Sequence, residues 1–394
     1  MIRLLSLTLA AFAIGISEFV LVGLLPTIAT DTHVPLGTAG LLVTVYALAI
    51  TVGSPLLTSL LSRYDSRWML TILMILFAAG NLLVAAAGGF AGLVVGRVLA
   101  GAAHGTVFAL GAPVAAAIVP KDKAARAISL MFLGLTVAMV LGVPLGTIIG
   151  NALGWRTTFA IVAALGAIAA IAIAALIPST STGESVRVRD QLALLADRPL
   201  AFTYVVTGLG FGATFAVFTF LEPLLSEHAG YTTAGVTGIL FLFGGATVIG
   251  NLAGGAFSDR LGTVRVIHIA LAGLAVSFVA VYLTSSSAVG IAIAVFVWGI
   301  FAFLISPAVQ THSVSLAGPQ GAGAEKAASG LNIAAFNAGI ALASWIGGIL
   351  VEGPGILTTP WAAVALTLVA LAASTQVTRP ARRTEADLLI GAVR

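Results

Sequence analysis

Twelve long apolar runs limit the possible folds of this chain more than any other feature of its sequence. Each is long enough to cross the hydrocarbon core of a bilayer as a helix, which takes about 20 residues. Only 8% of the 394 residues are charged, against about 25% in soluble domains, so lipid must face most of the surface. We therefore predict an all-α membrane protein with twelve transmembrane helices, at 4–28, 38–61, 68–88, 90–119, 127–153, 157–177, 200–225, 232–257, 266–284, 289–316, 327–351 and 360–377.

The basic residues predict how these spans are oriented. Of the 18 Lys and Arg residues, 16 lie at the termini or in one alternating set of loops, leaving Arg156 on the opposite side and Arg97 within a helix. Lys and Arg accumulate in cytoplasmic loops. We expect a multi-pass protein of the bacterial inner (cytoplasmic) membrane with both termini cytoplasmic. The first apolar run is too long for a cleaved signal peptide, so we interpret it as the first span.

Pairs of residues half a chain apart indicate an internal repeat. Pro26 and Pro223 are separated by 197 residues, and so are Arg63 and Arg260. The repeat predicts two pseudo-symmetric six-helix bundles, at 1–177 and at 200–394 with a short cytoplasmic tail. A polar cytoplasmic linker at 178–199 would join them. Repeats of this kind bind substrate between the halves, near the middle of the membrane.

A loop between two predicted spans carries the most specific motif. Residues 255–265 match the pattern G-x-x-x-D-R-x-G-x-x-R, which resembles the signature loop of the major facilitator superfamily. The equivalent loop of the first half keeps Arg63 but has Ser62 in place of the aspartate. The resemblance implies that these loops latch the cytoplasmic side, through Arg63, Asp259, Arg260, Gly262 and Arg265.

Two further motifs point to one branch of that family, the twelve-helix drug:proton antiporters that include sugar, purine and chloramphenicol exporters. Arg97 is similar to the family's intramembrane arginine, and Gly142, Pro144 and Gly146 resemble its antiporter motif. The resemblance covers essentially the whole chain. It implies export by proton antiport through alternating access.

Small residues recur every fourth position in two predicted spans. Glycine stripes allow helices to approach closely. We expect the stripes to form a sliding contact between the halves, with ordinary tight packing as the alternative. Their members are Gly134, Ala138, Gly142, Gly146 and Gly150 in the fifth span, and Ala246, Gly250 and Gly254 in the eighth.

Ionisable residues inside the apolar runs are the candidates for proton coupling, because charge at membrane depth is costly and usually functional. Glu18 is the candidate proton carrier; the alternative is a static ion pair with Arg97 that only ties two helices. His104 lies seven residues from Arg97 on the same helical face and is either a relay or a plain hydrogen-bonding residue. Glu222 is the second carboxyl candidate, unless it simply reaches interfacial water.

Polar and aromatic side chains of the spans are the candidate substrate contacts. Three phenylalanines share one helical face, which fits an apolar drug pocket but equally a packed core. The candidates are Tyr46, Phe211, Phe215, Phe218, Gln310, Asn332 and Asn337.

The sequence excludes several other classes of function. It contains no cysteine, its five histidines lack metal-ligand spacing, and it has no G-x-x-x-x-G-K-[ST] nucleotide loop. We expect no enzyme activity, no cofactor, no metal and no nucleic-acid partner.

The predicted function is export of a small drug-, sugar- or nucleoside-like compound by proton antiport. The expected partners are that substrate, protons and the lipid bilayer, and the protein is expected to be a monomer. An uncoupled facilitative sugar or nucleoside exporter, or a ligand-binding membrane sensor, is the alternative.

Overall fold

The computed structural model describes residues 2–61, 64–120, 123–179 and 193–377, and within these ranges every regular element is helical. Twelve spans are long and apolar enough to cross a membrane, which confirms the predicted all-α membrane fold. The first half contains α1 (Ile2–Phe19), η1 (Val20–Gly23), α2 (Leu25–Thr32), α3 (Leu36–Leu61), α4 (Ser66–Ala86), α5 (Phe90–Ala117), α6 (Ala124–Val137), η3 (Ala138–Gly142), α7 (Val143–Leu153) and α8 (Trp155–Leu176).

The second half repeats the pattern of six spans. Most of the predicted linker, 180–192, lies outside the described residues. The elements are α10 (Arg198–Val206), η4 (Thr207–Phe211), α11 (Gly212–Phe218), α12 (Leu221–His228), α13 (Thr233–Leu261), α14 (Thr263–Leu283), α15 (Ala288–Ala317), η5 (Gly318–Gln320), α16 (Ala322–Glu352), η6 (Ile356–Thr358), α17 (Thr359–Ala373) and η7 (Ser374–Gln376).

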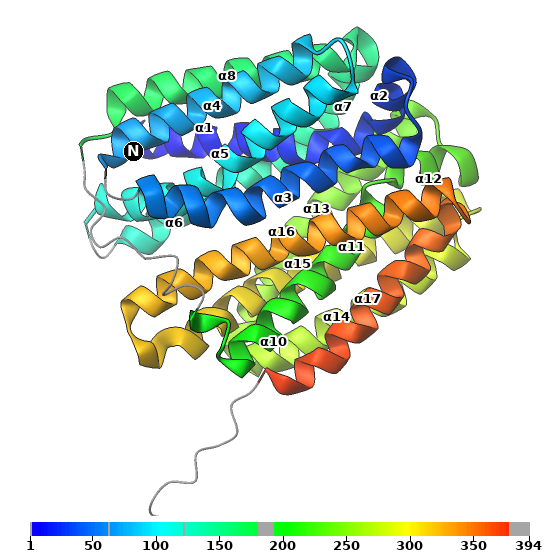
Figure 1. Ribbon diagram of the computed structural model, residues 1–394. Coiled ribbons are helices and arrows are strands. Elements are labelled where there is room, and N and C mark those ends of the chain that lie inside the picture. The colour runs from blue at the N-terminus through cyan, green and yellow to red at the C-terminus, as the bar shows by residue number, and fades with distance from the viewer. Residues whose placement is uncertain (1, 62–63, 121–122, 180–192, 378–394) are drawn as a thin grey trace, which may run out of the picture.

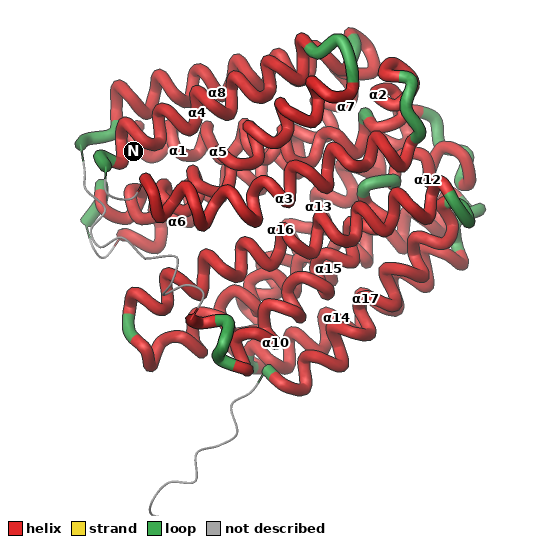
Figure 2. The backbone as a smooth tube through the Cα atoms, in the orientation of Figure 1, coloured by secondary structure: helices red, strands yellow, loops and turns green. Residues whose placement is uncertain are grey.

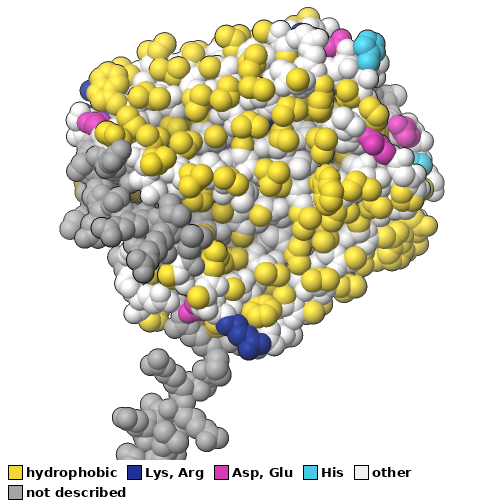
Figure 3. Space-filling model, viewed as in Figure 1, with side chains coloured by type: hydrophobic (Ala, Val, Ile, Leu, Met, Phe, Trp, Pro, Cys, Tyr) yellow, Lys and Arg dark blue, Asp and Glu magenta, His cyan; other side chains and the backbone are white. Residues whose placement is uncertain are grey.

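The helices form a bundle with two distinct ends (Figures 1 and 2). We call the end where the sixth span finishes and the seventh begins the linker end; it faces left in Figure 1, beside the N-terminus. The opposite end, where α2 and α12 lie, is the far end. Apolar side chains cover the face seen in Figure 3, and charged side chains gather toward the two ends. This is the surface expected of a protein surrounded by lipid.

The first and seventh spans are interrupted at the same place in the repeat. The sequence predicts continuous runs to residues 28 and 225, but α1 gives way to the 3₁₀-helical η1, and α11 ends at Phe218 before α12 begins. Pro26 and Pro223 lie in the first turns of the short helices that follow, where the missing amide hydrogen of proline is tolerated and its ring opposes a continuous helix with the preceding turn. Each interruption leaves a short helix, α2 or α12, at the far end.

Two spans contain a π-helical turn, η3 in the fifth span and η4 in the seventh. Pro144 follows η3 by two residues. It lacks an amide hydrogen, and its ring would clash with the carbonyl of Val140 in a regular helix, so the wider turn relieves the clash. π-helical turns are rare and often lie at functional sites.

The halves meet along two seams. One runs between α3 and α16, and the other between α13 and the η3–α7 segment. A methyl group at Gly37 would overlap the carbonyl oxygen of Gly348, and one at Gly244 would lie 2.8 Å from the carbonyl oxygen of Met139. Backbone therefore meets backbone across both seams. Gly40 adds a third contact near the far end, against the ring of Phe220.

The two glycine stripes do not lie on these seams, so the prediction that they join the halves is wrong. Gly142 and Gly146 pack against Ile16 and Val20 of the first span, within the first half. Gly250 packs against the backbone of the tenth span, within the second half. The alternative, ordinary tight packing, describes both stripes.

Burial differs between the two ends of the seam helices. α3 buries no residue after Ile50, and α13 buries none after Gly254. Both of these unburied parts lead to the linker end, whereas Gly37 and Gly40, near the far end, are buried. We interpret the arrangement as closed at the far end and open toward the linker end.

Candidate functional site

Arg97 lies at the centre of a buried polar cluster in the first half. Its side chain is fully buried in α5, where an unpaired charge would be costly. Nη1 donates to the carbonyl of Ser17 at 2.6 Å, and Nε donates to the carbonyl of Leu42 at 3.2 Å. The guanidinium also lies over the ring of Tyr46, 3.8 Å from the ring centroid. Arg97 thus ties the fourth span to the first and second.

Side chains on either side extend this cluster. Ser17 donates its hydroxyl to Oδ1 of Asn81 at 2.7 Å, and Asn81 donates to the carbonyl of Phe77 at 2.9 Å. On the other side, the hydroxyl of Tyr46 lies 3.1 Å from Nδ1 of His104. Asn81 was not among the predicted residues, although a fully buried amide within an apolar run was a detectable signal. The cluster therefore joins four spans.

Glu18 is not part of an ion pair. No nitrogen of a described Lys, Arg or His side chain lies within 4.0 Å of its carboxylate. Arg97 is nevertheless close enough to interact with Glu18 electrostatically. Nη2 of Arg97 is buried without a hydrogen-bond partner. Ser17 and Phe19 are buried, whereas Glu18 between them keeps accessible surface. The static ion pair that the sequence allowed is absent, because backbone carbonyls and the Tyr46 ring hold the cation instead.

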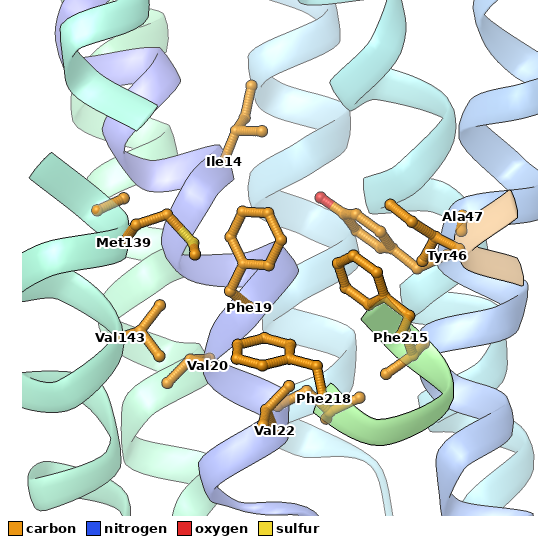
Figure 4. Packing of buried hydrophobic residues seen from close by; sticks show 14 of the residues in the cluster. Ile14, Phe19, Val20, Val22, Tyr46, Ala47, Met139, Val143, Phe215 and Phe218 are labelled. Atoms are coloured by element: carbon orange, nitrogen blue, oxygen red, sulfur yellow. The ribbon is translucent and has the colours of Figure 1, made fainter. Parts of the chain in front are cut away.

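Aromatic rings bridge the two halves beside this cluster. Phe19 of the first span and Phe215 of the seventh have ring centroids 6.3 Å apart. Figure 4 shows these two rings with Tyr46 and Phe218 between the helices. Phe215 and Phe218 meet edge to face at 5.7 Å, and Phe211 meets Phe215 at 5.8 Å. The predicted aromatic stripe is thus real, but only 7%, 3% and 2% of Phe211, Phe215 and Phe218 are exposed.

The predicted amides separate into two groups. Asn332 donates to Oε1 of Gln310 at 2.7 Å, and Gln310 donates to Oγ of Ser329 at the same distance. Thr207, in the π-helical turn of the seventh span, donates to Oδ1 of Asn332 at 2.7 Å. Asn337 is not joined to this chain by a hydrogen bond; it donates to its own helix, and its buried Oδ1 has no partner.

Glu222 lies apart from the spans, in α12 at the far end. It is partly buried, and this burial, together with the neighbouring Glu227, raises the pKa of its carboxyl above the ordinary value. A carboxyl group with these surroundings holds a proton more readily than a free glutamate.

The signature loop lies at the linker end and makes few contacts. The side chains of Asp259, Arg260 and Arg265 are exposed, and none of them forms a hydrogen bond or ion pair with a described residue. Gly262 adopts a φ of 83°, which glycine takes without steric cost, and links α13 to α14. Arg63 lies outside the described residues. In this arrangement the second-half residues of the motif therefore do not form the predicted latch contacts.

No metal centre is formed by the described part of the chain, where no three His, Asp or Glu residues converge. The remaining chemistry is that of a few buried polar side chains between membrane helices. It comprises an embedded arginine, an unpaired carboxyl group, a histidine and several amides.

Comparisons with known proteins agree with this architecture. Residues 7–324 match the family model of the Major Facilitator Superfamily. The chain is 44% identical over 359 residues to an uncharacterised MFS-type transporter, YtbD of Bacillus subtilis, covering 91% of this chain and 90% of that one. It is 35% identical over 372 residues to a chloramphenicol resistance protein of Streptomyces lividans, covering 93% of both.

A solved structure extends the likeness to the fold. A bacterial homologue of the human lysosomal transporter Spinster, in an inward-facing and occupied conformation, superposes with a TM-score of 0.76 at 16% identity, covering 98% of this chain and 97% of that one. The resemblance drawn from the signature loop is confirmed. The chain belongs to the major facilitator superfamily of membrane transporters.

Proposed function

We propose that this protein exports a small organic compound in exchange for protons, with Glu18 as the proton carrier. The observation that carries the proposal is the unpaired arrangement of Glu18 and Arg97. A carboxyl group deep in a membrane protein is costly when charged, unless a cation compensates it. Glu18 keeps accessible surface, and the nearby Arg97 has one unpartnered nitrogen, Nη2.

This geometry supports a two-state cycle of the carboxyl group. A protonated Glu18 is neutral and needs no cation, so it stays apart from Arg97. When the proton leaves, the carboxylate is drawn toward Nη2, which has no competing acceptor. Such a movement would strain the contacts of Arg97 with Ser17 and Tyr46. Proton release would in this way shift the first, second and fourth spans together.

The linker end is assigned to the cytoplasm in this proposal, with both termini there. The charge asymmetry of the loops supports the assignment. With that orientation the described arrangement is inward-open, and substrate enters from the cytoplasm or the inner leaflet. The bundles at 1–177 and 200–394 then rock against each other along the two seams, which is alternating access.

The rings and amides between the halves support a substrate that is mostly apolar and carries a few hydrogen-bonding groups. Phe19 and Phe215 pack against each other from opposite halves, and Oδ1 of Asn337 is a buried acceptor without a partner, so these groups would meet a substrate when the halves move apart. The chloramphenicol resistance relative makes antibiotics of that kind the first compounds to test. A pH unit and 100 mV of membrane potential supply about 1.4 and 2.3 kcal/mol per proton, enough to drive accumulation.

The test is transport by purified protein in proteoliposomes. A thermal-shift screen with chloramphenicol, sugars and nucleosides selects the substrate first, because a binder stabilises the folded state. An imposed pH gradient should then drive its uptake by the unmodified protein, while Glu18→Gln binds substrate but loses the pH-driven component. Glu325→Gln, at a glutamate in the first turn of α16 at the linker end, is the matched control and should keep it.

Three results would contradict the proposal in different ways. Full pH-driven transport by Glu18→Gln would remove Glu18 from the mechanism. Transport by the unmodified protein that ignores the pH gradient would favour an uncoupled exporter. Binding without any flux would favour a membrane sensor.

A further inference from the structure

We propose that Glu352 latches the far end of the transporter by capping a helix of the opposite half. The inference rests on alternating access, which is part of the proposed function, and it adds a gate that neither the signature loop nor the proton site supplies. Glu352 is the last residue of α16, in the second half, and its partner is Thr38 in the first turn of α3.

Two hydrogen bonds form the latch. Oε1 of Glu352 accepts from the backbone N–H of Thr38 at 2.7 Å and from its hydroxyl at 3.0 Å. The first amides of a helix have no acceptor within the helix, and they carry the positive end of its dipole. A carboxylate at this position is therefore bound by both hydrogen bonding and charge.

The pseudo-equivalent helix of the second half does not need such a partner. α13 begins after Thr232, whose hydroxyl accepts from the backbone N–H of Gly235 at 3.2 Å. α3 begins after Pro35, which has no side-chain oxygen to offer. The start of α13 is thus capped locally, whereas the start of α3 is capped from the other half. This difference between two repeats marks the contact as a link between halves.

Close backbone packing brings the two groups together. Gly37 and Gly348 lack side chains where α3 crosses α16, and a methyl group at Gly37 would also lie 2.8 Å from Cγ of Glu352. The carboxylate reaches Thr38 only because the helices approach this closely. If the far end opens, α3 and α16 separate here and both hydrogen bonds must break. The latch therefore favours the closed far end.

The expected strength suits a gate that opens in every cycle. Glu352 is exposed, so water competes for both partners. Charges at exposed helix termini contribute about 0.3–1 kcal/mol, which corresponds to a change of about two- to fivefold in the ratio of closed to open far ends. A contact of this size biases the equilibrium without trapping the protein.

The absence of cysteine allows a direct measurement. Cysteines introduced at Thr30 and Ser286, exposed positions at the far end of the two halves, accept spin labels in the otherwise unmodified chain. Pulsed electron–electron double resonance then gives the distance distribution across the far end, in detergent and in nanodiscs. The variants to compare are Glu352→Ala, Glu352→Gln and the matched control Glu227→Ala, which removes an exposed far-end glutamate that forms no ion pair with a described residue.

We expect Glu352→Ala to raise the population of long distances about two- to fivefold relative to the short one. Glu352→Gln, which keeps the acceptor oxygen but loses the charge, should fall between, and Glu227→Ala should leave the distribution unchanged. A distribution in Glu352→Ala that matches the unmodified protein would overturn the latch. An equal shift in Glu227→Ala would do so too, because it would reflect net charge.

The outcome is separable from that of the proposed function. The distance distributions are recorded without a pH gradient and without substrate. If the latch variants behave as expected but the protein shows no proton-driven transport, only the antiport proposal is contradicted. If the protein shows proton-driven transport but Glu352→Ala leaves the far-end distances unchanged, only the latch proposal is contradicted.

Discussion

The hydroxyl of Tyr46 lies 3.1 Å from Nδ1 of His104, while the face of the same ring lies 3.8 Å from the guanidinium carbon of Arg97. One side chain thus serves a neutral hydrogen bond at its tip and a cation at its face. These two roles can be separated by substitution.

Tyr46→Phe should cost less stability than Tyr46→Leu. The phenylalanine loses the hydrogen bond to His104, about 1 kcal/mol, but keeps a ring for Arg97. The leucine loses both, and a desolvated cation–π contact adds about 2 kcal/mol. Equilibrium unfolding of the purified protein in mild detergent measures the difference. Equal losses in the two variants would mean that Arg97 gains nothing from the ring.

Ser17 and Asn81 should be energetically coupled. Removing either side chain leaves the other without its 2.7 Å hydrogen bond, so the double variant Ser17→Ala/Asn81→Ala should be more stable than the sum of the single losses predicts. Interhelical hydrogen bonds within membranes average about 0.6 kcal/mol in such cycles. Strictly additive losses would contradict a direct interaction.

Two glycines of the same helix should respond oppositely to alanine. A methyl group at Gly339 would overlap the carbonyl of Gly208, so Gly339→Ala forces α16 away from the seventh span and should cost about 1–3 kcal/mol. A methyl group at Gly330 would meet nothing within 4 Å, so Gly330→Ala should gain about 0.5–1 kcal/mol. Thermal unfolding of both variants in parallel decides the matter, and a shift of the same sign in both would count against this packing.

The ion pair of Asp31 and Arg156 should stabilise the far end of the first half only above acidic pH. The hydrogen bond from Arg156 holds the pKa of Asp31 below its ordinary value of 3.8. A carboxyl group with a depressed folded-state pKa stabilises the fold fully above its unfolded value and loses that contribution as pH falls toward the folded value.

Asp31→Asn should therefore lower the unfolding temperature slightly at pH 7, and this deficit should shrink as pH falls below 3.8, the unfolded pKa, toward the lower folded pKa. Both side chains are 43% exposed, so the loss at neutral pH should stay under about 1 kcal/mol. Melting curves recorded at pH 7 and near pH 3.5 make the comparison. A deficit that persists unchanged in acid would assign the effect to something other than the carboxylate charge.

The number and type of the spans were predictable because span length is fixed by bilayer thickness. The repeated pair of Pro26 and Pro223 pointed to the interruptions of the first and seventh spans. Proline alone did not predict them, because Pro55, Pro113 and Pro307 lie inside continuous helices.

Asn81 was not predicted, although the same signal, an amide within an apolar run, had singled out Asn332 and Asn337. An amide buried inside a membrane-spanning bundle needs a hydrogen-bond partner, which Ser17 provides.

The contacts between helices could not be predicted from the sequence. Gly142 and Gly37 are chemically identical, yet one packs within its half and the other across a seam, because three-dimensional placement decides their neighbours. Glu18 and Arg97 posed the same problem. The sequence allowed an ion pair, but the carbonyls of Ser17 and Leu42 already occupy the guanidinium, and no pattern in the sequence predicts where a carbonyl points.

The π-helical turn of the seventh span also acts as a rotational joint. It accommodates one residue more than a regular turn, and one residue corresponds to about 100° of rotation around a helix. Thr207, the first residue of the turn, donates to Asn332, and the helix that follows the turn directs Phe215 to Phe19 of the other half. Removing a single residue there would leave the span helical but turn its aromatic face away from the opposite bundle. The contact between the aromatic rings of the two halves therefore depends on that one extra residue.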